Sequence, residues 1–234
     1  MNYEAILFDL DGTLLGIDTD DFTQHYIKLL VSYMAPFGYD PHEFVPTMWN
    51  GVQAMVQNDG TKANIDRFYD VFRKVYGQKA EDDIDIIIDF YKNDFDKLKM
   101  NVDRLDYAKE LVQLARKHSK HVILATNPFF PKEALITKLN WLGLTMEDFD
   151  LVTHYENSSF CKPNPKYYET ILKQFNLQPH QCLMVGNDVQ EDIEASVGLN
   201  HFLITNYIIH RKDEPLTMPH GDIEDFKSYL KRND

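Results

Sequence analysis

Cysteine is scarce in this chain of 234 residues, which contains only Cys161 and Cys182. Two cysteines provide neither a disulfide framework nor a paired set of metal ligands, so we expect two thiols in a reducing environment. The chain has no apolar run of 18 or more residues, which argues against a membrane span. Its first residues lack the basic and apolar regions of a signal peptide, and we therefore expect a cytoplasmic protein.

Positive charge is also in short supply. The chain has 24 Lys and Arg against 37 Asp and Glu, which gives a formal net charge of −13. Nucleic acids and anionic membranes bind to clustered basic side chains, so neither is an expected partner. The 44% hydrophobic and 26% charged residues are typical of folded domains and exclude a disordered or low-complexity chain. An anionic substrate would need a local source of positive charge.

Short apolar segments alternate with helical patterns over much of the chain. The apolar segments predict buried strands at 3–8, 121–125, 151–153, 182–185 and 201–204. Helical patterns follow at 105–117, 133–141, 166–175 and 223–230. This alternation predicts right-handed βαβ units, and hence a Rossmann-like three-layer α/β core in which helices cover both faces of a parallel sheet.

Residues 16–100 interrupt the alternation. They contain no strand pattern, and their helical patterns lie at 21–34, 42–57, 64–76 and 82–98. An all-helical block between the first strand and the rest of an α/β sheet predicts an insertion. We therefore expect a core formed by residues 1–15 and 101–234 and a helical domain formed by residues 16–100.

The first strand is followed by Asp9-Leu10-Asp11-Gly12-Thr13. Side chains at positions i and i+2 of an extended chain point the same way, so Asp9 and Asp11 project together. Open α/β sheets bind their ligands at the carboxyl ends of the strands, where this segment lies. Gly12 permits a sharp turn after the two acids. Taken alone, the segment fits a polar turn equally well.

Three further polar segments follow later strands: Thr126-Asn127, Lys162-Pro163, and Gly186-Asn187-Asp188 with Asp192. Each also has an ordinary structural explanation, namely a loop start, a solvated lysine and a helix N-cap. As a group they place neutral donors, a cation and further acids at one sheet edge. A lysine held between rigid turns can neutralise a phosphoryl group.

The parallel sheet concentrates Asp9, Asp11, Asp188 and Asp192 near one another. Two carboxylates ~5 Å apart repel by roughly 3 kcal/mol at an effective dielectric of 20. Either raised pKa values or a bound divalent cation would relieve this repulsion. Ligands that are all oxygen atoms favour a hard ion, Mg²⁺ before Ca²⁺ or Zn²⁺. With Lys162, such an ion would form a cationic pocket inside an acidic protein.

The four segments, in this order, resemble those of the haloacid dehalogenase-like hydrolase superfamily, and the helical insertion is similar to that family's first type of cap. The resemblance implies that Asp9 is the nucleophile, which forms an aspartyl-phosphate, and that Asp11 is the acid and base. It further implies phosphate binding by Thr126, Asn127 and Lys162. The ligands implied for Mg²⁺ are Asp9, the backbone carbonyl of Asp11 and the fourth segment.

The fourth segment departs from the family pattern, because many relatives have Gly-Asp-Ser where this chain has Gly186-Asn187-Asp188. Either Asn187 binds the metal through its amide oxygen or Asp188 does so, directly or through water. We favour Asp188 as the charged ligand, with Asp192 orienting the ligands from behind.

These features predict an Mg²⁺-dependent phosphatase of a small phosphorylated metabolite, such as a sugar phosphate, phosphoglycolate or a nucleoside monophosphate. Asp11 argues against a dehalogenase, because a halide leaves unprotonated. The alternatives are a β-phosphoglucomutase-like mutase, a phosphonatase using an insertion lysine such as Lys28, and a non-catalytic binding protein. The residues of the insertion that could face the substrate are His25, Met48, Trp49 and Gln53. Phe129 and Phe130 could line the entrance.

Overall fold

Six parallel strands form one sheet in the computed structural model, which describes residues 3–103, 106–212 and 214–232. In spatial order the strands are β3 (Leu151–Val152), β2 (Ser119–Leu124), β1 (Tyr3–Phe8), β4 (Cys182–Gly186), β5 (Asn200–Ile204) and β6 (His220–Gly221). Five of them lie where the apolar segments predict strands. The sequence does not predict β6, because a two-residue pairing that includes a polar histidine has no detectable periodicity.

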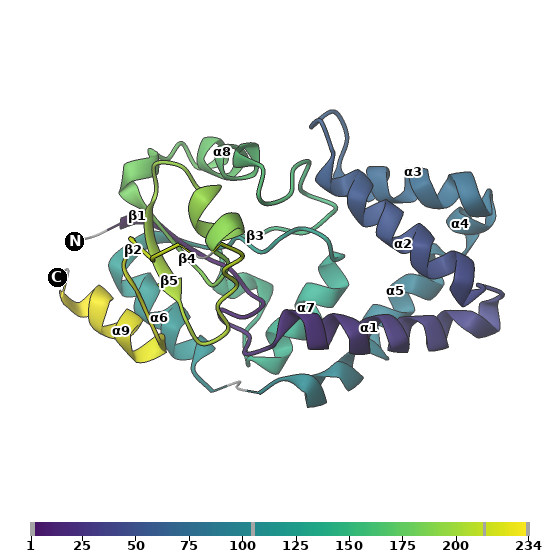
Figure 1. Cartoon of the computed structure of the whole chain (residues 1–234), viewed down its shortest axis with the longest axis horizontal. Coiled ribbons are helices and arrows are strands. Elements are labelled where there is room, and N and C mark those ends of the chain that lie inside the picture. Colours follow the sequence, from purple (N-terminus) through teal and green to yellow (C-terminus); the bar gives the residue numbers. More distant parts are fainter. Residues whose placement is uncertain (1–2, 104–105, 213, 233–234) are drawn as a thin grey trace.

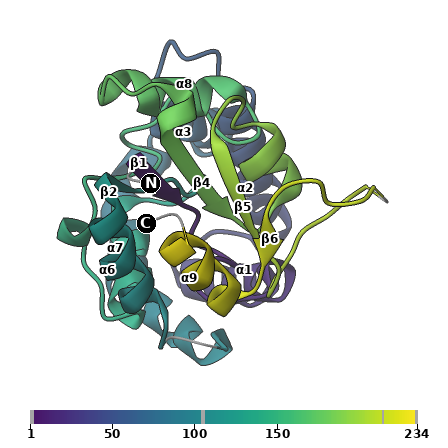
Figure 2. The same cartoon turned by 90° about the vertical axis from the view of Figure 1, so that its left-hand side faces the viewer.

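Alternate residues of the central strand pack against opposite layers. Ala5 and Leu7 of β1 contact the layer formed by α8 (Pro165–Gln174), whereas Ile6 and Phe8 contact the opposite layer. The helices of that opposite layer are α6 (Ala108–His118), α7 (Lys132–Trp141) and α9 (Ile223–Arg232). Figure 2 shows the sheet between these two layers, as the α/β prediction requires. Residue 105, where the predicted helix before β2 begins, lies outside the described residues.

The remaining helices lie between β1 and α6 in the sequence and to one side of the sheet in space (Figure 1). They are α1 (Thr19–Met34), α2 (Pro41–Val56), α3 (Asn64–Tyr76), α4 (Lys79–Asp82) and α5 (Ile84–Lys92). The single helix predicted over 82–98 is wrong. Asp83 ends α4, α5 ends before Asn93, and Phe95–Asn101 forms 3-10 turns. Asp and Asn favour such breaks because their side chains compete for backbone hydrogen bonds.

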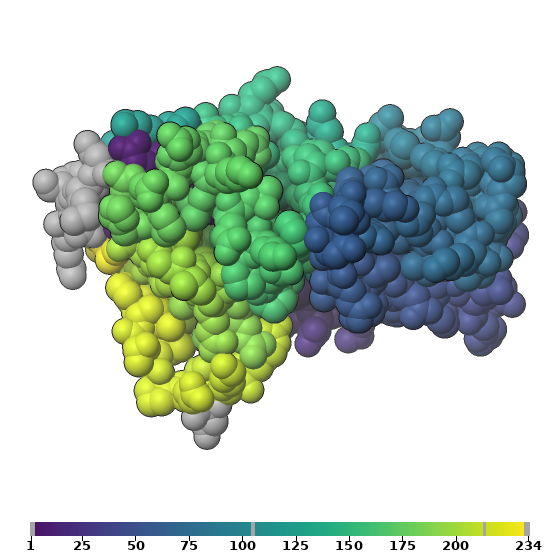
Figure 3. Space-filling model, turned by 90° about the horizontal axis from the view of Figure 1, so that it is seen from above, coloured from purple at the N-terminus to yellow at the C-terminus, as the bar shows by residue number. Residues whose placement is uncertain are grey.

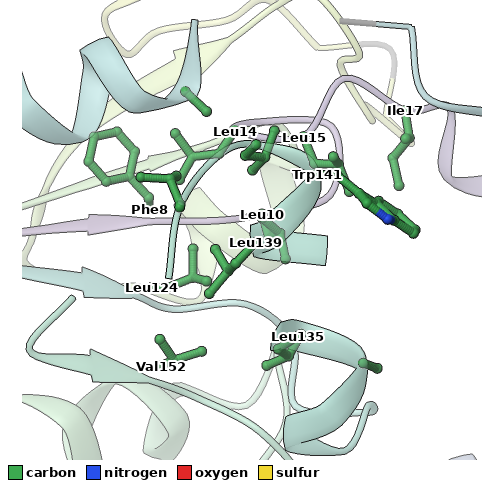
Figure 4. Close-up of a cluster of buried hydrophobic side chains, with 14 of the residues drawn as sticks. Phe8, Leu10, Leu14, Leu15, Ile17, Leu124, Leu135, Leu139, Trp141 and Val152 are labelled. Atoms are coloured by element: carbon green, nitrogen blue, oxygen red, sulfur yellow. The ribbon is translucent and has the colours of Figure 1, made fainter. Parts of the chain in front are cut away.

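The helical part and the sheet share one hydrophobic core. Figure 4 shows Phe8 and Leu124 of the strands beside Leu135, Leu139 and Trp141 of α7. The Trp141 ring stacks on Phe95 with ring centroids 5.7 Å apart, which connects α7 to the end of the helical part. In Figure 3 the helical part, in blue, directly adjoins the green surface of the core. No helix within the described ranges is long and apolar enough to cross a membrane.

Candidate active site

The strands at the centre of the sheet end level with one another. Phe8 of β1 is paired with Leu124 of β2 and with Val185 of β4. The polar segments that follow these three strands therefore begin at the same edge of the sheet. Asp9 continues the ladder by donating its backbone N–H to Val185 O at 2.9 Å. A cavity of about 280 Å³ opens at this edge. The predicted site residues that line it are Asp9, Asp11, Thr126, Asn127, Asn187, Asp188 and Asp192.

Lys162 lies behind the cavity lining and is fully buried between two carboxylates. Its ammonium donates to Asp9 Oδ1 at 2.8 Å and to Asp192 Oδ1 at 2.6 Å. Burial alone would lower the pKa of Lys162, but Asp192 and Asp9 outweigh it and hold that pKa well above its ordinary value. Burial also raises the pKa of Asp9 to about 8, with Lys162 opposing and Asp192 adding to the shift. The three groups form one buried cluster of charges.

Asp192 is oriented by the loop that follows β4. Its Oδ2 accepts the backbone N–H groups of Asn187 at 3.1 Å and of Asp188 at 3.0 Å, while Oδ1 accepts from Lys162. A Cβ on Gly186 would lie 2.2 Å from Asp192 Oδ2, so only glycine allows the strand to approach this carboxylate. Asp192 thus connects the loop to the buried lysine.

Asp188 begins the π-helical segment Val189–Glu194, as an N-cap residue does. Its Oδ1 accepts the backbone N–H groups of Gln190 at 2.9 Å and Glu191 at 3.1 Å. The same oxygen accepts from Arg211 Nη1 at 2.7 Å. The capping explanation and a role in the site are therefore compatible, because the second carboxylate oxygen takes no part in these bonds.

Asn187 holds the turn of the first motif. Thr13 Oγ1 donates to Asn187 Oδ1 at 2.9 Å, and Asn187 Nδ2 donates to the carbonyl of Tyr207 at 2.6 Å. Gly12 has a φ of +85°, and a Cβ there would lie 2.3 Å from Asn187 Nδ2. Glycine is therefore required both by the left-handed backbone and by the close approach of the amide.

Thr126 and Asn127 follow β2 and line the same cavity as the acids. The carbonyl of Thr126 accepts from the hydroxyls of Thr153 at 2.7 Å and Tyr167 at 2.9 Å, which fixes the backbone. Asn127 Nδ2 donates to Glu191 Oε2 at 2.9 Å, and Asn127 Oδ1 is buried without a partner. Burial raises the pKa of Glu191 to about 7, although Lys162 opposes this.

Asp11 is paired with a lysine that the sequence analysis does not identify. Lys138 of α7 is fully buried, and its Nζ lies 2.6 Å from Asp11 Oδ2. The ammonium also lies 4.3 Å from the ring centroid of Phe130 and 4.9 Å from that of Phe22. Asp11 Oδ1 is buried and has no hydrogen-bond partner among the described residues. Lys138 is therefore a positioning residue for Asp11.

Replacing Lys138 with methionine should reduce kcat by about 10- to 100-fold with little change in KM, because the ammonium orients an acid and does not line the cavity. Steady-state kinetics of Lys138→Met would measure both constants. Lys138→Arg should recover part of the loss, since it restores a cation. Lys132→Met, on the exposed face of the same helix, is the matched control. A kcat for Lys138→Met within twofold of the wild type would contradict the positioning role.

The charges of the site do not balance. The carboxylates are Asp9, Asp11, Asp188, Glu191 and Asp192, and the cations paired with or close to them are Lys138, Lys162 and Arg211. Five negative and three positive groups leave an excess of two negative charges when all are ionised. No group of three or more His, Cys, Asp or Glu able to hold a metal occurs in the described ranges. A cation here would therefore combine two carboxylates with carbonyl, amide or water oxygens, a set that suits Mg²⁺.

Three site residues are missing from the sequence analysis: Lys138, Glu191 and Arg211. None of the three leaves a clear signal: Lys138 lies one helical turn from Ala134 and Leu135, but the apolar residues of α7 do not form a single stripe. Among the residues suggested for the insertion, Met48 and Trp49 line the cavity, as do Phe129 and Phe130. His25 and Gln53 are exposed and lie outside it, and so does Lys28.

The fold is a three-layer α/β fold with polar residues at the carboxyl edge of its sheet, and the comparison with known families identifies the class of protein. The family model of the haloacid dehalogenase-like hydrolases matches residues 3–198, so the chain belongs to that family. The pyrophosphatase PpaX of Bacillus anthracis is 25% identical to this chain over 188 residues, which covers 80% of this chain and 76% of that protein.

Solved structures show the same fold. A 2-haloacid dehalogenase from Pseudomonas syringae superposes with a TM-score of 0.64 at 15% sequence identity, covering 99% of this chain and 100% of that one. The HAD-hydrolase YfnB from Bacillus subtilis, which was solved bound to magnesium, superposes with a TM-score of 0.59 at 17% identity over 99% and 100% of the two chains. At these identities the likeness concerns the fold alone.

Proposed function

We propose that the protein is a phosphatase that hydrolyses a small phosphorylated metabolite. The observation that supports it best is the cavity in which Asp9, backed by Lys162, lies beside a second, separately positioned acid, Asp11. Two acids are needed when the leaving group must be protonated, whereas dehalogenation needs only the nucleophile. The pyrophosphatase relative also acts on a phosphoryl substrate, which supports the same class of reaction.

In the proposed reaction, a carboxylate oxygen of Asp9 attacks phosphorus and forms an aspartyl-phosphate while the bond to the leaving oxygen breaks. Asp11 gives its proton to that oxygen and then takes a proton from the water that attacks the intermediate, which releases phosphate and restores Asp9. Lys162 holds Asp9 in place and stabilises its charge. The side chains of Thr126 and Asn127 line the cavity where the phosphoryl oxygens would lie.

We propose Mg²⁺ as the cofactor, held by Asp9, the backbone carbonyl of Asp11, and Asp188 or Asn187. The excess of two negative charges that the site carries when all its groups are ionised, and its oxygen ligands, fit a divalent hard ion. Bound there, Mg²⁺ would offset the charge of the phosphoryl group and so allow an anion to enter an acidic site. Asp188 remains the favoured charged ligand because only its Oδ1 is used in the capping and Arg211 bonds. Asp192 orients this loop from behind.

We further propose that residues 16–100 act as a cap over the core formed by residues 1–15 and 101–234. The cavity supports this division, because it is lined both by α1, α2, α3 and α5 and by the carboxyl edge of the sheet. The exposure of Lys28 outside the cavity disfavours a phosphonatase that uses this lysine. A mutase on the same fold remains the second candidate, since Asp9 would form the same intermediate.

Removal of the metal tests the proposal directly. The purified protein with Mg²⁺ should hydrolyse p-nitrophenyl phosphate, and excess EDTA should reduce the rate at least about 100-fold because the acidic cavity then repels the substrate. Added Mg²⁺ in excess of the chelator should restore the rate. The release of p-nitrophenolate measures both steps. Hydrolysis that persists unchanged in EDTA would contradict the metal requirement, and the absence of hydrolysis with Mg²⁺ would contradict the phosphatase.

A further inference from the structure

The cavity has two chemically different ends. The end at the sheet edge is formed by the acids, Thr126 and Asn127, whereas the end formed by α1, α2, α3 and α5 is mostly apolar. The apolar end includes Phe22, Met48, Val52, Phe68 and Phe72. Among the described lining residues, α1–α5 contribute no charged side chain. We propose that the substrate is the phosphate ester of an apolar alcohol that carries a ring or a branched alkyl group, an inference that rests on the proposed phosphatase function.

The hydroxyl groups that line the apolar end belong to Thr19, Thr23, Tyr26, Tyr69 and Tyr91, and two of them are paired with each other. The hydroxyls of Tyr26 and Tyr91 hydrogen-bond to each other at 2.6 Å, and burial raises the pKa of Tyr26 to about 12, so it stays neutral. Thr19 and Thr23 are the remaining polar side chains that α1 contributes. A sugar would replace only some of the hydrogen bonds to water that it loses here, because most of the lining is apolar, and that loss disfavours binding.

The size of the cavity fits the same class of ligand. A cavity of roughly 150 Å³ lined by apolar side chains is enough to bind benzene. The present cavity, about 280 Å³, can therefore hold one ring together with a phosphoryl group at its acidic end. Trp49 of α2 lines the same cavity and is 47% exposed, which places an aromatic side chain between the cavity and solvent. Aromatic walls favour a ring through edge and stacking contacts.

The position of the only guanidinium argues against a second phosphate as the leaving group. Arg211 is the only Lys or Arg among the described lining residues, and its Nη1 lies 2.7 Å from Asp188 Oδ1. It belongs to the acidic end, so no cation on α1–α5 could stabilise a second phosphoryl group. Pyrophosphate, the substrate named for the PpaX relatives, is therefore the most useful competing substrate for the test.

The test compares primary alkyl phosphates, whose leaving oxygens have similar basicity. With Mg²⁺ present, kcat/KM for 2-phenylethyl phosphate should exceed that for glycerol 1-phosphate by at least about 100-fold, as expected for a hydrophobic pocket that gains a ring. It should also exceed the value for pyrophosphate. Met48→Gln, which places an amide in the wall, should reduce the first ratio about 10-fold. Met100→Gln, at a methionine that is 87% exposed, should leave it unchanged.

A binding measurement separates this inference from the proposed function. 2-Phenylethylphosphonate cannot be hydrolysed, and it should bind the wild-type protein at least about 10-fold more tightly than methylphosphonate by calorimetry. Tight binding without hydrolysis of any ester would support the apolar site and overturn the phosphatase. Hydrolysis in which glycerol 1-phosphate or pyrophosphate is preferred would overturn the apolar substrate and leave the phosphatase standing. Equal binding of the two phosphonates would overturn the inference even if Met48→Gln fails to fold.

Discussion

Asp9→Asn is expected to reduce kcat by at least about 10³-fold, because an amide cannot form the acyl phosphate on which the proposed reaction depends. The substitution should not weaken the fold. The Asn side chain can still accept the hydrogen bond that Asp9 Oδ1 accepts from Lys162, and it removes one of two carboxylates from a buried cluster. We therefore expect an unchanged or higher Tm. Single-turnover kinetics and a thermal scan on the same sample would measure both effects.

The matched control for this prediction is Asp66→Asn, an exposed aspartate of α3 that lies outside the cavity. Its turnover should equal that of the wild type, because the same chemical change is made far from the proposed chemistry. An independent measurement is to trap the intermediate: rapid quenching of the wild-type protein during turnover should leave phosphate covalently bound to Asp9. Turnover of Asp9→Asn within tenfold of the wild type would rule out Asp9 as the nucleophile.

Lys162→Met should have the largest effect on stability. The substitution keeps the length of the side chain but leaves Asp9 and Asp192 buried without their shared cation. Removing one partner of a buried ion pair costs about 3–5 kcal/mol. For a chain of this size that corresponds to a fall in Tm of roughly 6–20 °C. Activity should fall as well, since Asp9 loses the group that holds it in place.

The stability lost in Lys162→Met should increase with pH. Burial raises the pKa of Asp9 from the ordinary value near 4 to about 8. A raised pKa means that the folded protein favours the protonated acid, so this contribution to stability is complete below pH 4 and is lost as the pH rises towards 8. Without Lys162 to oppose the shift, the pKa of Asp9 would rise further, so the loss would continue to a higher pH. Lys162→Met should therefore approach the Tm of the wild type at pH 5 and depart from it at pH 8.

Lys173→Met provides the control for the lysine substitution, since Lys173 is exposed on α8. Its Tm should follow that of the wild type at every pH, apart from a few tenths of a kcal/mol for the charge at the helix end. A Lys162→Met protein as stable as this control at pH 8 would show that Asp9 and Asp192 do not depend on the lysine.

The strands and the sheet edge were predictable because they depend on local patterns. The run 3–8 is apolar on both faces, and in β1 Ala5 and Leu7 do pack on one layer while Ile6 and Phe8 pack on the other. Parallel pairing then brings Asp9 to the same edge as the segments after β2 and β4 without further information. The structure confirms the α/β fold predicted from these patterns. The roles of the site residues stay predictions.

The partners of the acids were harder to predict because they come from distant segments. Arg211 follows β5 in a loop without periodicity, so nothing local indicates that it pairs with Asp188. The apolar residues of α7 do not form a single stripe that would mark Lys138 as buried, and its partner, Asp11, is 127 residues away. The apolar end of the cavity was equally hidden, since a stripe on α1 or α2 gives no sign whether it faces a neighbouring helix or an open space.

The ammonium of Lys138 lies close to Phe22 and Phe130, and both rings also line the cavity. A ligand that displaces either ring would therefore also displace the ammonium of Lys138, which is paired with Asp11. In the proposed reaction, contact between the organic part of the substrate and these rings would therefore affect the position of Asp11 through one lysine. A ligand that is too small to contact these rings would bind without changing the position of Asp11.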